Sequence, residues 1–285
     1  MDISIVICTK NRSEKLSRCL DVINNLESQN LNVELVIVDN NSSDNTQQII
    51  INFSQKSRFA LKSVIEKNKG SGYSRNKGIL NSKGKIIVMV DDDCYLEKNY
   101  LQITSSQFKD SRVGFVAGRI LLYDETDSRM TTLYDENKKE FNELQLIQPG
   151  RILGANLCFR KDALFSVNCF DTMLGTGTKF AAEDIDCAYR ILSKGWKGLY
   201  EPELIVYHHH GRKNPVDTEK LVIFYDRGTG VYFLKCFLNP LFNIWIKLSV
   251  IKCFLFKKNI KRHHAVQGAF EYIYEWILKS FKAHF

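Results

Sequence analysis

Several features that would mark a secreted or disulfide-stabilised protein are missing from this 285-residue sequence. The first apolar run covers only six residues, Ile3 to Cys8, and has neither a basic leader nor a small-residue cleavage site, so a secretory signal is not expected. The eight cysteines show no C-x-x-C spacing, and we interpret them as reduced thiols used for packing, neither disulfides nor zinc ligands. A cytoplasmic location is therefore expected.

Internal repeats and low-complexity tracts are also absent, and a hydrophobic content of 44% is enough to bury a core. The net charge of +8 is unevenly distributed. Residues 1–210 contain 27 basic and 27 acidic residues, whereas residues 211–285 contain 13 and 5. A neutral body with a basic appendage follows, and such an appendage suits either a nucleic acid or an anionic membrane surface.

Short apolar runs alternate with helical patterns along the first 120 residues. Each run is rich in β-branched residues and ends in polar residues that favour a turn. This alternation predicts an α/β fold with a mostly parallel sheet and helices on both faces. The expected strands lie at residues 3–8, 33–38, 86–90 and 113–117.

In such sheets the ligand lies beyond the carboxyl ends of the strands, and the polar loops 9–12, 39–44 and 91–93 are all expected there. The polar stretch 124–150 is expected to be a surface excursion. After Pro215 the composition changes to aromatic, aliphatic and basic residues. We therefore predict a catalytic domain at residues 1–214 and a helical C-terminal region at residues 215–285.

Three consecutive aspartates, Asp91, Asp92 and Asp93, follow a buried strand directly. Like charges this close repel one another at a poorly solvated strand end, so a cation is needed to neutralise them. Hard oxygen ligands suit Mg²⁺ or Mn²⁺. A solvated acidic turn that caps the next helix is the alternative, and this motif alone leaves both interpretations open.

A second acidic group, Glu183 and Asp184, begins a helix with one apolar face. Asp186 is spaced four residues from Arg190 and is expected to pair with it, which leaves the two earlier acids available for chemistry. Acids that only complement the helix dipole are the simple alternative.

Three histidines, His208 to His210, follow a further strand-like run. Neighbouring side chains in an extended segment alternate sides, so one or two of them at most can be metal ligands. A surface histidine without a ligand role is the alternative.

Six motifs follow one another along the sequence: Ile5-Val6-Ile7-Cys8-Thr9-Lys10-Asn11-Arg12, Val36 to Asp44, Ser74-Arg75-Asn76-Lys77-Gly78, Asp91-Asp92-Asp93, Gly154-Ala155-Asn156, and Glu183 to Asp186 with Arg190. In this order they resemble the motifs of the family-2 glycosyltransferases, and the resemblance covers about residues 3–211. That family has the GT-A fold, a Rossmann-like sheet, and mostly transfers sugars with inversion.

The resemblance implies a metal-dependent transfer of a sugar from a nucleotide diphosphate, with a uridine diphosphate sugar favoured, onto an acceptor hydroxyl in surface glycan or polysaccharide assembly. Asp184 is implied as the general base, with Glu183 beside it. Asp93 and His208 are implied as ligands of Mn²⁺ or Mg²⁺. The implied donor contacts are Thr9, Asn11, Arg12, Asp39 at the base, Arg75, Asn76, Asp91 at the ribose, and Asp92; the implied acceptor side is Gly154, Ala155 and Asn156.

Two rival functions remain open on the sequence. A sugar nucleotidyltransferase would be expected to carry an early glycine-rich loop, and residues 9–12 are not glycine-rich. A catalytically silent sugar-nucleotide-binding protein would not need Asp93 and Asp184. The Gln-x-x-Arg-Trp motif found in many family members is absent, which favours addition of a single sugar.

The C-terminal region is apolar from Val231 to Phe256, but Pro240, Lys247 and Lys252 interrupt it, which counts against a membrane span. A basic cluster follows, and residues 265–281 form an amphipathic pattern. We expect peripheral attachment to an anionic membrane on its cytosolic face, a glycan or lipid-linked acceptor, and no nucleic-acid partner. Packing on the body or in a homo-oligomer is the alternative. The basic cluster is Lys257, Lys258, Lys261 and Arg262, and the polar stripe of the amphipathic pattern is Gln267, Glu271, Glu275 and Lys279.

Overall fold

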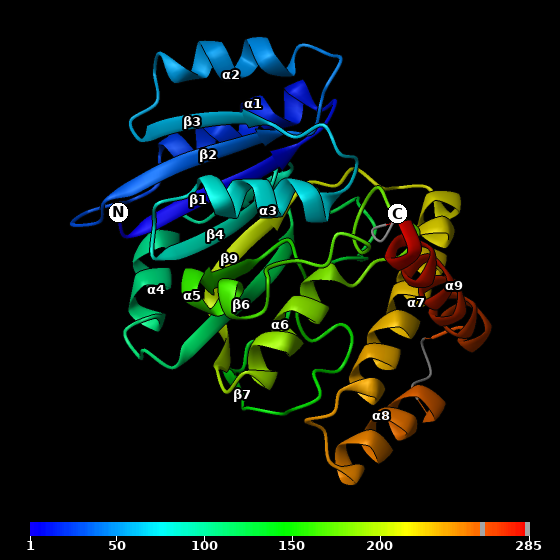
Figure 1. Ribbon diagram of the computed structural model, residues 1–285. Helices are drawn as coiled ribbons and strands as arrows, with labels where there is room; N and C mark the ends of the chain where they lie inside the picture. The colour runs from blue at the N-terminus through cyan, green and yellow to red at the C-terminus, as the bar shows by residue number, and fades with distance from the viewer. Residues whose placement is uncertain (257–259, 283–285) are drawn as a thin grey trace.

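Residues 1–256 and 260–282 are described by the computed structural model in Figure 1. The strands that they form join in one sheet of order β3-β2-β1-β4-β8-β6-β9-β5, and β7 pairs with β9. The strands are β1 (Ile3–Thr9), β2 (Val33–Asp39), β3 (Ala60–Ile65), β4 (Ile86–Asp91), β5 (Cys94–Leu96), β6 (Val113–Leu122), β7 (Lys139–Phe141), β8 (Leu157–Arg160) and β9 (Lys197–His208).

Strand direction confirms the mostly parallel sheet. β3, β2, β1 and β4 pair in parallel, and β6 and β9 share their direction because the antiparallel strand β8 separates β4 from β6; β5 and β7 pair antiparallel with β9. β1 lies between β2 and β4, with Thr9 opposite Asp39 and Cys8 opposite Asp91. This register brings the loops after β1, β2 and β4 to one edge, as the sequence predicts.

Helices cover both faces of the sheet, which confirms the layered α/β architecture (Figure 1). Apolar residues of α1, α2 and α4 fill the core on one face, and those of α3, α5, α6 and α7 fill the other. The helices are α1 (Ser13–Asn24), α2 (Thr46–Ser54), α3 (Ser71–Asn81), α4 (Tyr100–Gln107), α5 (Lys161–Ser166), α6 (Glu183–Ser193), α7 (Pro215–Leu238), α8 (Ile244–Phe256) and α9 (Arg262–Lys282).

The four expected strands correspond to β1, β2, β4 and β6, and the pattern before the histidines is the end of β9. β3 escapes the sequence pattern because it is an edge strand whose side chains are mostly exposed. β5, β7 and β8 escape it because they have only three or four residues. Stretch 124–150 is irregular apart from β7, as expected.

The C-terminal helices pack closely on the body. Glycines allow α7 to approach its neighbours: a Cβ on Gly230 would lie 1.8 Å from the Ala265 carbonyl oxygen of α9. Tyr232 and Cys236 of α7 are fully buried in the same core as the sheet. The predicted boundary at residue 215 coincides with the start of α7, where Asn214 caps the helix by accepting a hydrogen bond from the backbone N–H of Val216 (2.9 Å).

Part of the polar stripe of α9 faces the rest of the protein: Glu271 and Glu275 are half-buried, whereas Gln267 and Lys279 are exposed. Glu271 pairs with Arg227 of α7, and Glu275 pairs with Lys179 at 2.7 Å. The opposite side of α9 is apolar and exposed, for example at Phe270 and Trp276. Within the described residues, no helix combines the length and the apolar character that crossing a bilayer requires. Of the basic cluster, Lys257 and Lys258 lie outside the described residues, while Lys261 and Arg262 are exposed.

Candidate active site

The three aspartates after β4 are neutralised in part by basic side chains of α1 and the loop before it. The Arg12 guanidinium lies 2.9 Å from an Asp92 oxygen and 3.0 Å from an Asp93 oxygen, and the Lys15 ammonium lies 3.6 Å from Asp93. Thr9 donates a hydrogen bond to Asp92 (2.7 Å). The predicted donor residues of β1 and β4 therefore form one charged cluster.

The pKa values of Asp92 and Asp93 are shifted in opposite directions. Burial raises the pKa of Asp92 to about 6, although Arg12 and Thr9 oppose this rise. Burial also works against ionisation of Asp93, but the hydrogen bond to His208 and the charges of His208, Arg12 and Lys15 outweigh it and hold the Asp93 pKa well below its usual range. Asp93 is thus kept as a carboxylate, which is the form that binds a cation.

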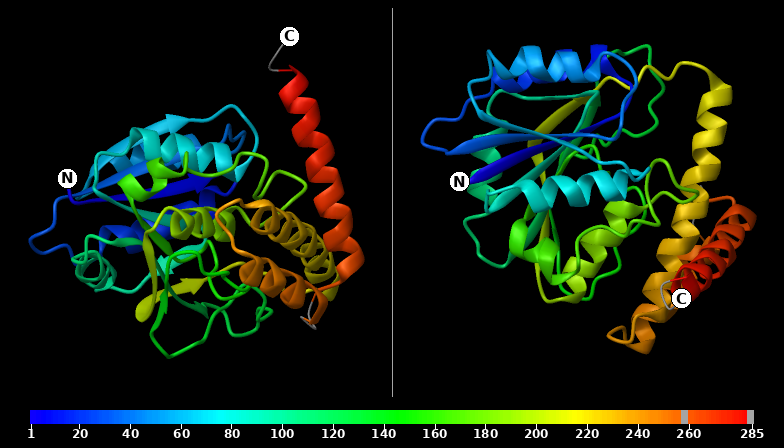
Figure 2. Two further views of the ribbon diagram at one scale, coloured as in Figure 1. Left: turned by 60° about the horizontal axis from the view of Figure 1, so that its bottom comes forward. Right: turned by 45° about the horizontal axis from the view of Figure 1, so that its top comes forward.

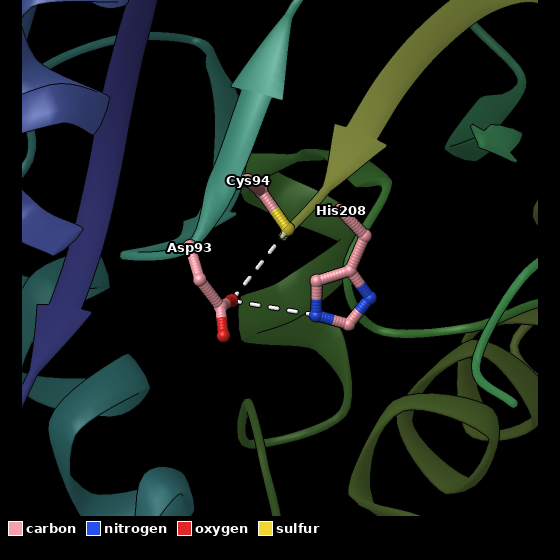
Figure 3. A group of neighbouring side chains, drawn as sticks. All are labelled: Asp93, Cys94 and His208. Atoms are coloured by element: carbon pink, nitrogen blue, oxygen red, sulfur yellow. Dashed lines mark hydrogen bonds and ion pairs between the residues drawn. The ribbon is translucent and has the colours of Figure 1, made fainter. Parts of the chain in front are cut away.

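A possible metal-binding group forms around Asp93 (Figure 3). His208 ends β9 and places its Nε2 atom 3.4 Å from an Asp93 oxygen, and the thiol of Cys94 lies 4.0 Å from the same oxygen. One ligand atom of each residue lies within 4.8 Å of the others. These donors suit a divalent cation in kind and in spacing. The interpretation of all eight cysteines as packing residues is therefore incomplete, although all eight are free thiols.

The three histidines alternate sides as expected. His208 and His210 are both buried, with ring centroids 5.1 Å apart, and His210 lies 3.6 Å from Asp127. His209 points the other way and contacts the Tyr95 hydroxyl at 3.1 Å. Only His208 among them joins the group around Asp93.

The predicted catalytic acids lie at the start of α6, beside the aspartate cluster. Arg75 of α3 bridges the two sites: its guanidinium lies 2.7 Å from a Glu183 oxygen and 3.4 Å from an Asp91 oxygen. Glu183 is buried, and its ion pair with Arg75 compensates its charge there. The neighbouring Asp184 is half-buried. Asp186 pairs with Arg190 at 2.8 Å, which confirms the predicted pairing.

The surroundings of Asp184 favour its protonated form. Burial raises its pKa most, and hydrogen bonds from the backbone N–H groups of Ile185 and Gly154, together with the charge of Arg75, oppose that rise. Burial and the Asp184 charge raise the pKa of Glu183 in the same way. A half-buried carboxylate of raised basicity has the properties of a general base.

Gly154 makes room for this arrangement. A Cβ atom there would lie 3.1 Å from an Asp184 oxygen and 3.2 Å from the Arg75 guanidinium. Ala155 is buried, and Asn156 is fully buried with its amide bonded to the Tyr100 hydroxyl and to two backbone carbonyls. The side chain of Asn156 therefore holds this loop in place, and of the three residues predicted on the acceptor side only Gly154 is not buried.

The loop after β1 and the loop after β2 are joined by a hydrogen bond. Asn11 has a φ of 52° and accepts a hydrogen bond from the backbone N–H of Ser43 (2.7 Å). Asp39 ends β2 and accepts one from the backbone N–H of Ser42 (2.9 Å). The amide of Asn76 exchanges two hydrogen bonds with the backbone of Phe170, so both of its polar atoms already have partners there.

Three residues near the site were not singled out from the sequence. Lys15 and Cys94 follow shortly after the predicted residues Arg12 and Asp93 in the sequence. This proximity could have indicated that they belong to the same site. Tyr225 of α7 carries no such signal. Its side chain is 37% exposed, and burial of the remainder, together with the charges of Asp184 and Glu183, raises the pKa of its phenol.

This chain belongs to the family described as Glycosyl transferase family 2, whose pattern matches residues 4–165 and thus more than half of the sequence. Among curated relatives, glycosyltransferase AglE of Haloferax volcanii is 23% identical over 206 residues, which is 72% of this chain and 66% of AglE. The chain spans about half to two thirds of the length of AglE and of several other curated relatives.

Solved structures share the fold. The mannosyltransferase PcManGT of Pyrobaculum calidifontis, solved with GDP-Man and Mn²⁺, superposes with a TM-score of 0.69 at 17% identity, covering 93% of this chain and 73% of that one. TarS of S. aureus, solved with UDP-GlcNAc, gives 0.65 at 17% identity, covering 90% and 73%. The predicted GT-A fold is therefore confirmed.

Proposed function

We propose that this protein transfers a sugar, with inversion, from a nucleotide diphosphate to an acceptor hydroxyl. The observation that carries the proposal is the convergence of two acidic groups at one sheet edge: Asp91 to Asp93 at the end of β4, and Glu183 with Asp184 at the start of α6. Arg75 joins the two groups through its ion pairs with Asp91 and Glu183. Membership of the family supports a transferase over a sugar nucleotidyltransferase.

Each group has a distinct chemical task. Asp184 accepts the proton of the acceptor hydroxyl as the hydroxyl oxygen attacks the anomeric carbon, and the bond from that carbon to the diphosphate oxygen breaks. Arg75 neutralises Glu183 and Asp91, so that Asp184 can hold its own charge when the pH is high enough. A divalent cation held by Asp93 and His208 would stabilise the charge of the departing nucleotide diphosphate.

The donor is proposed to be a nucleotide sugar held along the loops after β1 and β2, with a uridine diphosphate sugar favoured. Asp39 would accept the imide N–H of the base, Asp91 would hold the ribose, and Arg12 would face the phosphates. Similar folds bind such donors, since TarS was solved with UDP-GlcNAc and PcManGT with GDP-Man. A carboxylate opposite the base fits uracil because its ring N–H is a donor.

We also propose that α8 and α9 hold the enzyme on an anionic membrane at its cytosolic face, where a lipid-linked acceptor of surface glycan assembly would lie. The exposed aromatic side chains of these helices include Trp245, Phe256, Phe270 and Trp276. Only two acids, Glu271 and Glu275, follow Asp226 in the sequence. Both are paired with basic side chains, Glu271 with Arg227 of α7 and Glu275 with Lys179. The outer surface is thus apolar and basic, which suits an anionic interface and disfavours a second copy of the same charge.

A thermal-shift panel of nucleotide sugars, with and without Mn²⁺, tests the donor and the metal together. A donor at about 100 times its Kd stabilises the folded state by about 2.7 kcal/mol, so a rise of several degrees in Tm is expected for the matching donor with Mn²⁺. Asp93→Ala should abolish the metal-dependent part of this rise, because the cation loses a ligand, and the remaining carboxylates of Asp91 and Asp92 repel the diphosphate when no cation is bound.

The matched control is Asp110→Ala, since Asp110 is an exposed aspartate whose ion pair with Arg112 lies outside the site. It should leave the rise unchanged. Donor stabilisation that is equal in Asp93→Ala and the unchanged protein, with or without chelator, would contradict the metal assignment. Release of free nucleotide diphosphate from the matching donor separates an enzyme from a silent binding protein.

A further inference from the structure

The group around Asp93 contains a sulfur atom that the proposed chemistry does not use. Cys94 begins β5 and is the cross-strand partner of His208 in the antiparallel pair of β5 and β9, so both side chains project from the same side of the sheet. Figure 3 shows the Cys94 thiol and the His208 ring both directed toward the Asp93 carboxylate. Cys94 is fully buried.

The spacing of these atoms fits one ion held between them. Around a tetrahedral Zn²⁺-type ion, with metal–nitrogen and metal–oxygen distances of about 2.0–2.1 Å and a metal–sulfur distance of about 2.3 Å, nitrogen and oxygen lie about 3.3 Å apart, and sulfur and oxygen about 3.6 Å. The observed separations from the Asp93 oxygen are 3.4 Å to the His208 nitrogen and 4.0 Å to the Cys94 sulfur. Small side-chain rotations would close the remaining difference.

Neighbouring groups hold two of these ligands in place. The Nδ1 atom of His208 lies 3.4 Å from the Thr131 hydroxyl, which leaves Nε2 facing Asp93. The thiol of Cys19 hydrogen-bonds to the backbone carbonyl of Cys94 at 3.3 Å. Outer contacts of this kind orient the ligands of metal sites.

We propose that Cys94 is a thiolate ligand of this metal site, beside Asp93 and His208. The inference rests on the metal of the proposed function and specifies its donor set: one oxygen, one nitrogen and one sulfur, with remaining positions for donor phosphate oxygens. When the sulfur–metal bond forms, the thiol proton is released to solvent. A sulfur ligand favours thiophilic ions such as Zn²⁺, Cd²⁺ and Co²⁺ over Mg²⁺.

Cobalt absorption spectroscopy of the 285-residue protein, with uridine diphosphate present, tests the sulfur ligand without an activity assay. Co²⁺ in the site should give visible ligand-field bands and an additional near-ultraviolet band from thiolate-to-cobalt charge transfer. The near-ultraviolet band should be lost in Cys94→Ala and in Cys94→Ser. Cys236→Ala is the matched control, because Cys236 is an equally buried thiol of α7 that lies in the other core cluster from Cys94, and the band should persist there.

The outcomes separate the two proposals. Visible bands without the charge-transfer band in the unchanged protein, or a band that survives in both Cys94 variants, would overturn the thiolate ligand and leave the metal of the proposed function standing. No cobalt spectrum at all would overturn both. Thermal unfolding of Cys94→Ser, which nearly keeps the volume of the side chain, shows whether loss of the band reflects a lost ligand or a lost fold.

Discussion

At the scale of single residues, the raised pKa of Asp184 sets how the activity should depend on pH. A general base acts only when it is ionised, and burial moves the ionisation of Asp184 to higher pH than for an ordinary aspartate, near 3.9. The rate should therefore fall, as pH decreases, at a pH clearly above 3.9. A profile of kcat/KM against pH measures this limb for the free enzyme.

Asp184→Asn is the control for this assignment, because an amide keeps the size of the side chain and loses its basicity. It should keep donor binding and lower transfer by about 10²–10⁴-fold. Near-normal turnover in Asp184→Asn would move the role of base to Glu183. An acid limb at or below the ordinary aspartate value would contradict the effect of burial.

At the scale of secondary-structure elements, a buried ionic network fastens α7 to α6. The Lys235 ammonium lies 2.6 Å from an oxygen of Asp186, which is fully buried, and 2.8 Å from an oxygen of Asp171. Removing one partner of a buried pair leaves an uncompensated charge. Lys235→Met should therefore lower the free energy of unfolding by about 3 kcal/mol, measured by urea denaturation.

Lys213→Met is the matched control, because Lys213 forms an ion pair of equal length, 2.8 Å, with Asp124 at the surface. Exposed pairs contribute about 0–1 kcal/mol, so this variant should change stability little. Equal losses in both variants would show that the network around Asp186 does not have the importance that its burial indicates.

The secondary-structure elements also show which parts of the fold and of the candidate site the sequence could predict. The apolar runs of β1, β2 and β4 are visible as patterns because both of their faces are buried, and the parallel register then brings the loops after them together. The sequence points to Asp184 only through its motif, and the charge of Arg75 that acts on Asp184, on which its proposed role as base depends, is set by how α6 packs against α3. The closeness of Tyr225 to the two acids and the inward direction of Glu271 on α9 could not be predicted from the sequence. Which side of a helix faces the rest of the protein is decided by contacts between residues distant in sequence.

At the scale of the whole molecule, α8 and α9 lie along one end of the body, as the two views of Figure 2 show, and expose apolar side chains. Phe270→Ser together with Trp276→Ser should weaken binding to anionic vesicles in a flotation assay by about tenfold or more, since burial of each aromatic side chain contributes on the order of 1.5–3 kcal/mol. Binding should also weaken as salt rises, because electrostatic attraction is screened over a Debye length of about 8 Å at physiological ionic strength.

Ile51→Ser together with Leu80→Ser is the control, because these exposed apolar residues lie on α2 and α3, far along the chain from the C-terminal helices. It should leave flotation unchanged. If the unchanged protein fails to float with anionic vesicles at low salt, the exposed helices are better explained as an interface between proteins, and analytical ultracentrifugation would show the oligomer.

The ionic network around Asp186 also has a consequence for how the enzyme is made. A chain emerging from the ribosome has its N-terminal strands available first. Asp186 and Asp171 are already present in α6 and the loop before it, but their lysine partner arrives only with residue 235, and Tyr272, which donates a hydrogen bond to Asp171, arrives later still. The helix that bears Asp184 therefore reaches its final packing only after residue 272 has been synthesised, so shorter nascent chains are not expected to carry out the proposed transfer.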